Sequence, residues 1–228
     1  MVLRTMTVNL KPSVVARLII RNQIDLNETW NITDAMNVLH EISRIEVDEL
    51  LQIIDSTPIQ SCLTPDEIPQ FGKIETVWEV PRVLVETGMG QLNYAQVGFY
   101  LKNNESSTRE ANYKFGENHG KCAGMLGLVN YHSDSIFLSS ISCAVKSIAS
   151  QEEKIMLLSK LCFRIKSIAL ILKNARNGIV NGFDHLSLLS ESTKIRRGAS
   201  LKSIFKLLEK LENDDLSNRL KNITWNIN

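Results

Sequence analysis

One helical segment of the chain carries three evenly spaced glycines. Residues 107–129 read STREANYKFGENHGKCAGMLGLV and have the apolar spacing of a helix, interrupted by Gly116, Gly120 and Gly124. Each glycine costs about 1 kcal/mol relative to alanine inside a helix. The four-residue interval places all three on one face, where missing side chains let another backbone approach closely. The segment therefore has to lie against something that touches its main chain.

A helical wheel divides this segment into two predicted faces. The face predicted to meet the core holds Ala111, Phe115, Cys122, Met125 and Leu126. The opposite half holds the glycines together with Arg109, Asn112 and Tyr113. Two interpretations follow and both stay open: the glycine face lies against the backbone of DNA, or it packs against the C-terminal helices.

Composition limits the class of protein. The chain has 228 residues, 43% of them apolar, which is enough for one large or two small globular domains. It has no apolar run of membrane-spanning length, and its first residues lack the pattern of a secretory signal. The four cysteines form no CxxC pair, so we expect a cytoplasmic protein with reduced thiols and neither disulfides nor a zinc site.

Charge is segregated along the chain although the net charge is only +1. Residues 25–79 hold twelve acids and two bases, a local charge of −10, whereas residues 160–206 hold ten bases and two acids, a local charge of +8. This asymmetry indicates an anionic partner for the basic part or docking of the two parts onto each other. Solvated faces of ordinary helices are the third alternative.

The periodicity predicts a mainly α fold with a small β-hairpin wing. Between a Pro-rich linker at 56–72 and residue 138, the order is helix 73–87, short helix 94–101, polar turn 102–107, helix 108–126 and hairpin 129–138. That order is typical of a winged helix-turn-helix. We expect an acidic helical region at 1–70, the winged helix at 71–140 and a basic helical extension at 141–228.

The flanking regions are also predicted to be helical. Expected helices cover 12–21, 34–55, 140–150, 152–174 and 200–212, with Asn31 or Thr33 capping the second. The helix over 152–174 is predicted to be continuous and mostly buried, with Leu161 and Ile165 among its least exposed residues. Lys160 and Arg164 lie elsewhere on its wheel.

Two motifs give the chain a resemblance to a known family. They are Ser107-Thr108-Arg109 with Tyr113 and the exit Leu126-Gly127-Leu128, and the later element STKIRRGAS at 192–200. Over residues 73–211 the sequence resembles the winged-helix modules attached to type II restriction endonucleases and related phage-defence proteins. It departs from their pattern at Lys114, where a second tyrosine is usual, and at 117–120. The resemblance implies duplex DNA binding within a restriction or defence system.

The motifs of common catalytic sites are missing. GxGxxG, a Walker loop and GxSxG do not occur in the sequence. We therefore predict no catalytic residue, metal ligand or cofactor, and whether the chain is an enzyme stays open. If it is one, the resemblance implies a type II restriction-like endonuclease.

The leading functional hypothesis is duplex DNA binding. The residues predicted to contact DNA are Arg109, Asn112, Tyr113, Lys114, Gly116, His132, Arg196 and Arg197. Arg196 and Arg197 are expected at the start of the last helix and on one surface with Arg109, with a salt bridge to the acidic region as their alternative role. Two other hypotheses stay open: a nuclease whose acids are among Asp34, Glu41, Asp48 and Glu49, and a protein-interaction module with an acidic, DNA-mimicking region. A protein partner or a homodimer is also left open.

Overall fold

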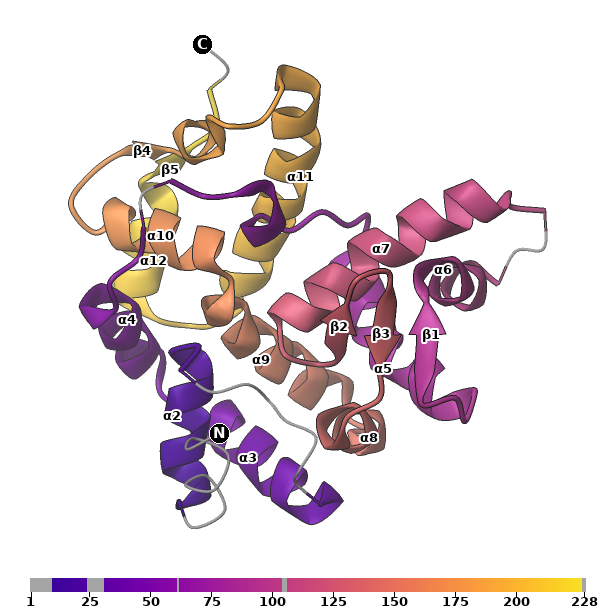
Figure 1. Cartoon of the computed structure of the whole chain (residues 1–228). Coiled ribbons are helices and arrows are strands. Elements are labelled where there is room, and N and C mark those ends of the chain that lie inside the picture. Colours follow the sequence, from indigo (N-terminus) through magenta and orange to yellow (C-terminus); the bar gives the residue numbers. More distant parts are fainter. Residues whose placement is uncertain (1–9, 24–30, 61, 104–105, 227–228) are drawn as a thin grey trace.

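The chain forms a mainly helical fold with one small antiparallel sheet (Figure 1). The computed structural model describes residues 10–23, 31–60, 62–103 and 106–226. Helices α2 to α12 lie in this part of the chain, with a three-stranded sheet and a two-stranded parallel pair. The prediction of a mainly helical fold with a small β-hairpin is thus confirmed. Every helix among the described residues falls short of the length and apolar character that a bilayer span requires.

The N-terminal part consists of three short helices. They are α2 (Pro12–Ile20), α3 (Ile32–Arg44) and α4 (Val47–Ser56). Asn31 caps α3 as predicted, because its side chain accepts a hydrogen bond from the Asp34 amide at 2.8 Å. The predicted single helix over 34–55 is wrong, since the chain is extended between α3 and α4.

A lysine from a helix far away in the sequence binds the backbone carbonyl groups at the break between α3 and α4. Lys160 Nζ donates hydrogen bonds to the carbonyl oxygens of Ser43 and Ile45, at 2.5 and 2.7 Å. The Lys160 side chain is buried, and burial lowers its pKa while the negative charge of Glu46 opposes that shift. The break therefore depends on a contact that local sequence does not reveal.

The middle part runs helix, strand, helix, helix and hairpin. Its elements are α5 (Ile74–Glu86), β1 (Gln91–Asn93), α6 (Tyr94–Lys102), α7 (Arg109–Met125), β2 (Asn130–His132) and β3 (Ser135–Phe137). Asn93 caps α6 and Thr108 caps α7, as their side-chain types favour. The predicted helices and hairpin are confirmed to within two residues. Asn104 and Glu105 of the predicted turn lie outside the described residues.

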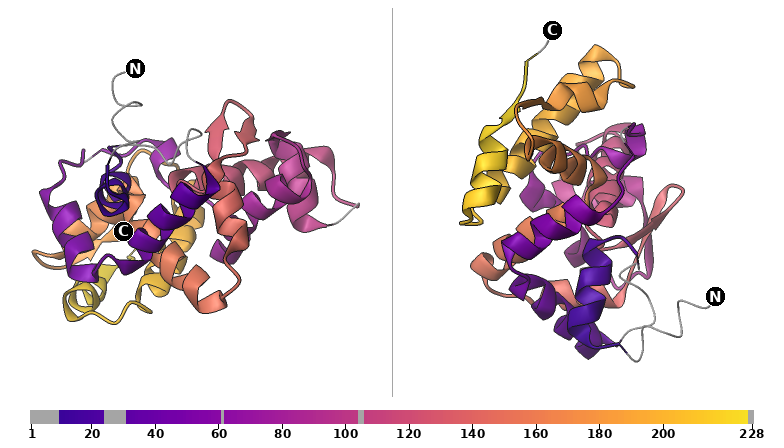
Figure 2. Two further views of the ribbon diagram at one scale, coloured as in Figure 1. Left: turned by 90° about the horizontal axis from the view of Figure 1, so that it is seen from below. Right: turned by 90° about the vertical axis from the view of Figure 1, so that its left-hand side faces the viewer.

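The small sheet ties the hairpin to the start of α6. Its strand order is β1–β3–β2, all antiparallel, with Ile136 opposite Leu92 on one side and Tyr131 on the other. The Tyr94 amide donates to the carbonyl of Asp134 at the hairpin turn, at 2.9 Å. The hairpin stands out from the helices in both views of Figure 2.

The C-terminal part is built from short helices and one long one. Its elements are α8 (Ser140–Ser147), α9 (Gln151–Leu161), η3 (Cys162–Arg164), α10 (Lys166–Ala175), β4 (Val180–Asn181), η4 (Gly182–Leu186), α11 (Glu191–Leu208), α12 (Asp214–Lys221) and β5 (Ile223–Thr224). The predicted burial of Leu161 and Ile165 is confirmed, at 0% and 1% exposure. The predicted continuous helix over 152–174 is wrong, because Ile165 is extended (φ −71°, ψ 115°) and separates α9 from α10.

One apolar core runs through all three predicted segments. Its buried side chains come from α2 to α5, from the small sheet and α7, and from α8 to α12. Helix α3 packs against α8 and α9, and α5 packs against α7 and α8. The acidic, middle and basic parts of the sequence are therefore joined by shared burial.

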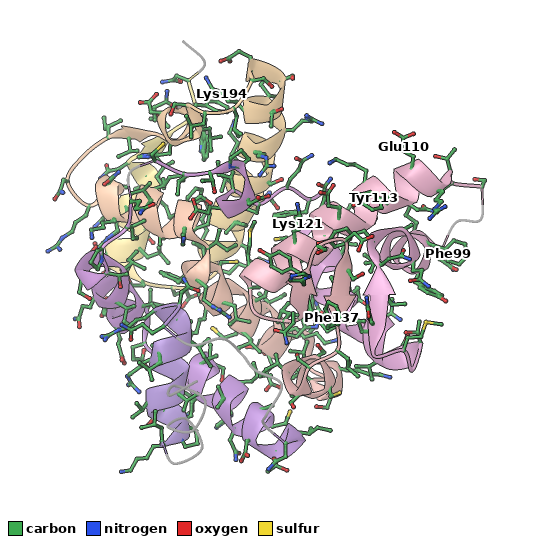
Figure 3. The ribbon with its side chains drawn as sticks, in the orientation of Figure 1. Phe99, Glu110, Tyr113, Lys121, Phe137 and Lys194 are labelled. Atoms are coloured by element: carbon green, nitrogen blue, oxygen red, sulfur yellow. The ribbon has the colours of Figure 1, made fainter. Side chains whose placement is uncertain are left out.

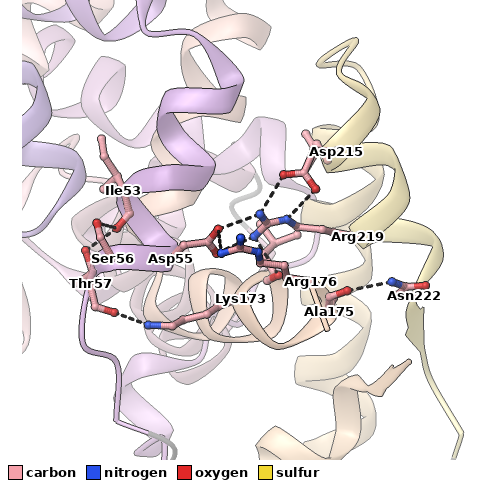
Figure 4. A network of polar contacts seen from close by, with 12 residues as sticks. Ile53, Asp55, Ser56, Thr57, Lys173, Ala175, Arg176, Asp215, Arg219 and Asn222 are labelled. Carbon is pink, nitrogen blue, oxygen red and sulfur yellow. Dashed lines mark hydrogen bonds and ion pairs between the residues drawn. The ribbon is translucent and has the colours of Figure 1, made fainter. Parts of the chain in front are cut away.

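The basic part docks onto the acidic part by direct polar contacts (Figure 4). Arg219 on α12 lies between Asp55 of α4 and Asp215, with N–O distances of 2.8–3.2 Å. Arg176 also pairs with Asp55, at 3.1 Å, and Lys173 donates to the Thr57 carbonyl at 2.8 Å. Lys166 pairs with Glu67. Lys166, Lys173 and Arg176 of the basic stretch thus contact the acidic stretch directly, as the docking alternative predicts. Asp25 and Glu28 of the acidic stretch lie outside the described residues.

Candidate nucleic-acid interface

The first two turns of α7 present polar side chains to solvent. Arg109, Tyr113 and Lys114 are all exposed there. Figure 3 labels Glu110 and Tyr113 on the N-terminal half of this helix. Tyr113 is fixed by an edge-to-face contact with the buried ring of Tyr94, at 5.7 Å between centroids, and Lys114 pairs with Glu117 at 2.7 Å. Thus three of the predicted contact residues are accessible in the first turns of α7.

The glycine face of α7 turns inward, against α6. A Cβ on Gly116 would lie 1.9 Å from the carbonyl oxygen of Tyr94, and a Cβ on Gly98 of α6 would lie 1.9 Å from that of Asn112. The two helices therefore cross backbone to backbone, each through a glycine. The assignment of Gly116 to DNA contact is wrong for this reason. The packing alternative holds, but the partner is α6 rather than the C-terminal helices.

For two residues of α7, the structure reverses the burial that the helical wheel predicted. Asn112 is only 5% exposed, and its Nδ2 donates to the Ser107 carbonyl at 3.5 Å, so it faces α6 instead of a duplex. Ala111, predicted to be in the core, is exposed. The core side of the first turns of α7 consists of Asn112 and Gly116, which a hydropathy pattern places on the wrong side.

The tip of the β2–β3 hairpin belongs to the same middle part of the fold as α6 and α7. His132 is exposed at the end of β2, where its Nδ1 lies 3.0 Å from Ser133 Oγ, and Ser133 adopts a left-handed backbone (φ 54°). Tyr131, 42% exposed, is seated against Gly124, where a Cβ would lie 2.1 Å from the ring. The third glycine of the stripe therefore seats the hairpin on α7.

Arg196 and Arg197 lie in the second turn of α11 and do not open the last helix. Arg197 is half-buried and donates hydrogen bonds to the carbonyl oxygens of Pro65 and Ile68. Burial lowers its pKa. Arg196 is exposed and bonds to Ser192 and Thr193 of its own helix. Arg197 thus anchors the linker, which is close to the predicted alternative of docking to the acidic region, and Arg196 alone is accessible.

The linker contact brings α11 close to the outer face of α7. Arg197, Pro65 and Lys114 line one small cavity of about 50 Å³, and Lys121 of α7 pairs with Asp66 at 3.5 Å. The C-terminal half of α7 is therefore flanked by the linker and α11. Its N-terminal half projects from the body of the molecule (Figure 1).

A shallow groove beside Arg109 was missed at the sequence level. It lies between α6 and the start of α7, has a volume of about 380 Å³, and is lined in part by Phe99, Tyr100 and Arg109. Both rings are exposed and meet edge to face at 5.5 Å. The sequence offered one weak signal, the adjacent aromatic residues Phe99 and Tyr100, whose side chains leave the helix in directions about 100° apart.

Most of the titratable side chains considered outside the exposed face of α7 form contacts within the fold. His119 is buried beneath Phe115, and burial lowers its pKa, although its hydrogen bond to the Phe115 carbonyl opposes this. Among the described residues no group of three or more His, Cys, Asp or Glu side chains is placed to hold a metal ion. Asp34 lies in the first turn of α3, and the other three acids considered for a nuclease, Glu41, Asp48 and Glu49, contact Arg44, Asn213 and Arg17.

Comparisons with protein-family models, curated proteins and solved structures found no match for this chain. The resemblance to restriction-associated modules therefore stays a prediction from the residues quoted above. The geometry of α6, α7 and the hairpin is therefore the basis on which a function can be proposed.

Proposed function

We propose that residues 74–137 form a winged helix-turn-helix that binds duplex DNA, with α7 as the recognition helix. Three features support this: the order α5, β1, α6, α7, hairpin; the sheet order β1–β3–β2; and the close backbone crossing of α6 and α7. Helix-turn-helix proteins place the first residues of the second helix at base edges in the major groove. The wider role as a targeting part or companion of a restriction or defence system is what the sequence resemblance implies.

Two observations carry the proposal: the accessible start of α7, and the exposed hairpin that packs on the C-terminal half of the same helix. Arg109 and Tyr113 are proposed to reach base edges, and Lys114 a phosphate. His132 at the hairpin tip is proposed to touch phosphate or the minor groove, and Arg196 to add a phosphate contact. Asn112, Gly116 and Arg197 are left out of the proposed interface. Their contacts lie within the protein, so they stabilise the fold.

Fluorescence anisotropy with duplex DNA tests this proposal. Affinity should fall steeply between about 50 and 200 mM salt, as phosphate neutralisation requires. Lys114→Gln should reduce the salt slope by about one unit, whereas Arg109→Ala should relax sequence preference at one position by about 1–3 kcal/mol. Lys210→Gln is the charge-matched control, because Lys210 is an exposed lysine just beyond the far end of α11 and should leave binding unchanged.

The same assay separates the other functional hypotheses. Cleavage of the duplex when Mg²⁺ is added would support the nuclease instead. Absence of DNA binding at low salt would contradict the proposal and favour a protein-interaction module. Equal loss of binding in the Lys114 and Lys210 variants would show only general charge attraction and would remove α7 from the interface.

A further inference from the structure

The groove between α6 and the start of α7 is lined by a residue whose side chain has an unsatisfied acceptor. Asn112 is 5% exposed, and its Oδ1 is buried without a hydrogen-bond partner among the described residues. Its Nδ2 reaches only the Ser107 carbonyl, at 3.5 Å, which is longer than a usual N–H···O bond. The amide is therefore held weakly and can turn to offer Oδ1 to an N–H group in the groove. A buried acceptor without a donor destabilises a fold, so a ligand that donates there gains affinity.

Aromatic surface lines the same groove. Phe99 and Tyr100 are both exposed along it, and Figure 3 labels Phe99 on α6. Their rings meet edge to face, with an angle of 75° between their planes. A planar heterocycle can stack on the face of such a ring, as nucleobases do on aromatic side chains. The groove therefore favours a ligand with a flat aromatic part.

The remaining polar side chains of the groove are donors. Arg109 lines it and is exposed, and no carboxylate of the described residues pairs with its guanidinium. The side-chain oxygens of Asn93 and Gln96 accept hydrogen bonds from each other's backbone amides, at 3.0 and 2.9 Å, which leaves their NH₂ groups as donors. None of the described residues that line the groove is acidic. An anionic group thus fits beside Arg109.

We propose that this groove binds a nucleoside monophosphate whose base carries an amino group. The base stacks on the Phe99 and Tyr100 side, its amino group donates to Asn112 Oδ1, and its phosphate binds Arg109. The groove volume of about 380 Å³ lies within the range of about 300–1,000 Å³ found for ligand pockets. The site shares Arg109 with the proposed DNA interface but requires no DNA, so it does not rest on the proposed function.

Isothermal titration calorimetry of the whole chain with adenosine monophosphate (AMP) tests the proposal. AMP should bind saturably at one site. Adenosine, purine riboside monophosphate and ribose phosphate lack the phosphate, the amino group and the base, respectively. Each should bind about tenfold more weakly than AMP or not at all, as expected when one of the three contacts is lost.

Two substitutions of exposed residues test the proposed contacts. Phe99→Ala should weaken AMP binding about tenfold, because the stacking surface is lost. Leu188→Ala is its control, since Leu188 is an exposed apolar residue outside the groove and should bind AMP like the parent. Arg109→Gln should no longer distinguish AMP from adenosine, because the phosphate then has no cation to bind.

A groove-filling variant makes the test specific to this site. Ala95 is partly exposed on α6 and lines the groove, so Ala95→Trp should occupy it and abolish AMP binding. Ala199→Trp, at an exposed position of α11, is the matched control and should bind like the parent. No AMP binding by the parent, equal binding of AMP and ribose phosphate, or equal AMP binding by the two tryptophan variants would each overturn the proposal.

Discussion

Gly116→Ala is expected to destabilise the protein by about 3 kcal/mol, although alanine is the better helix former by about 1 kcal/mol. The added Cβ would lie 1.9 Å from the Tyr94 carbonyl oxygen and 2.7 Å from the Gly98 amide nitrogen. Both obstacles are backbone atoms, so relief requires α6 and α7 to move apart. Urea denaturation followed by circular dichroism measures the effect.

Gly90→Ala is the matched control for this substitution. A Cβ at Gly90 meets nothing within 4 Å, so its stability should stay within about 0.5 kcal/mol of the parent. If Gly116→Ala were as stable as the parent, the backbone crossing of α6 and α7 would be wrong. The glycine stripe would then need another explanation, such as the close approach to DNA considered from the sequence.

Arg219→Met is expected to cost about 3 kcal/mol, the range found when one partner of a buried ion pair is removed. Arg219 is 3% exposed and joins α12 to α4 through Asp55. Burial alone would lower the pKa of Arg219, but its hydrogen bonds to Asp55 and Asp215 more than offset this, so it stays charged. Methionine would fill the space and leave Asp55 with Arg176 alone. Urea denaturation measures the loss.

Arg82→Met is the control, because Arg82 also pairs with two carboxylates, Glu79 and Glu86, but its side chain is 44% exposed. Exposed pairs contribute about 0–1 kcal/mol, so this variant should differ little from the parent. Similar losses in the two variants would show that the Arg219 contacts contribute no more than a surface pair.

The Arg219 contacts also predict how stability depends on pH. The hydrogen bond from Arg219 lowers the pKa of Asp55, against the opposing effect of burial. The folded-state pKa therefore lies below that of the unfolded chain, which is about 3.9. This contribution is complete above that value and is lost as the pH falls through the folded-state pKa. Arg219→Met should lose less stability on acidification than the parent.

Local sequence signals predicted the middle part of the fold well. Asn93 and Thr108 are capping residues placed directly before apolar spacing, and both begin helices where expected. Leu126-Gly127-Leu128 marks the end of α7, where Gly127 adopts φ 77°. These signals act within a few residues of the bond they predict, so a single sequence reveals them.

Features that depend on distant contacts were not predictable in this way. The breaks at Ile45 and Ile165 contain neither glycine nor proline. They are stabilised by hydrogen bonds from Lys160 of α9 and from Asn22, which follows the end of α2. The helical wheel predicted the wrong inward face for α7, because that face carries Asn112 and Gly116, which are not apolar side chains. Gly116 packs there because it has no side chain, and Asn112 because its amide forms a hydrogen bond. The roles of Arg197 and Arg219 were also hidden, since a charged residue on a wheel is assigned to solvent unless its partner is known.

Site-specific photocrosslinking tests the proposed recognition helix most directly. A benzoylphenylalanine in place of Tyr113 or His132 should crosslink to duplex DNA, because both positions lie on the proposed interface. The same residue in place of Ile179, which is 80% exposed in the segment between α10 and β4, should not. Crosslinks from Tyr113 and His132 alone would support α7 and the hairpin as the interface. Crosslinks from Ile179 alone, or equal yields at all three positions, would contradict it.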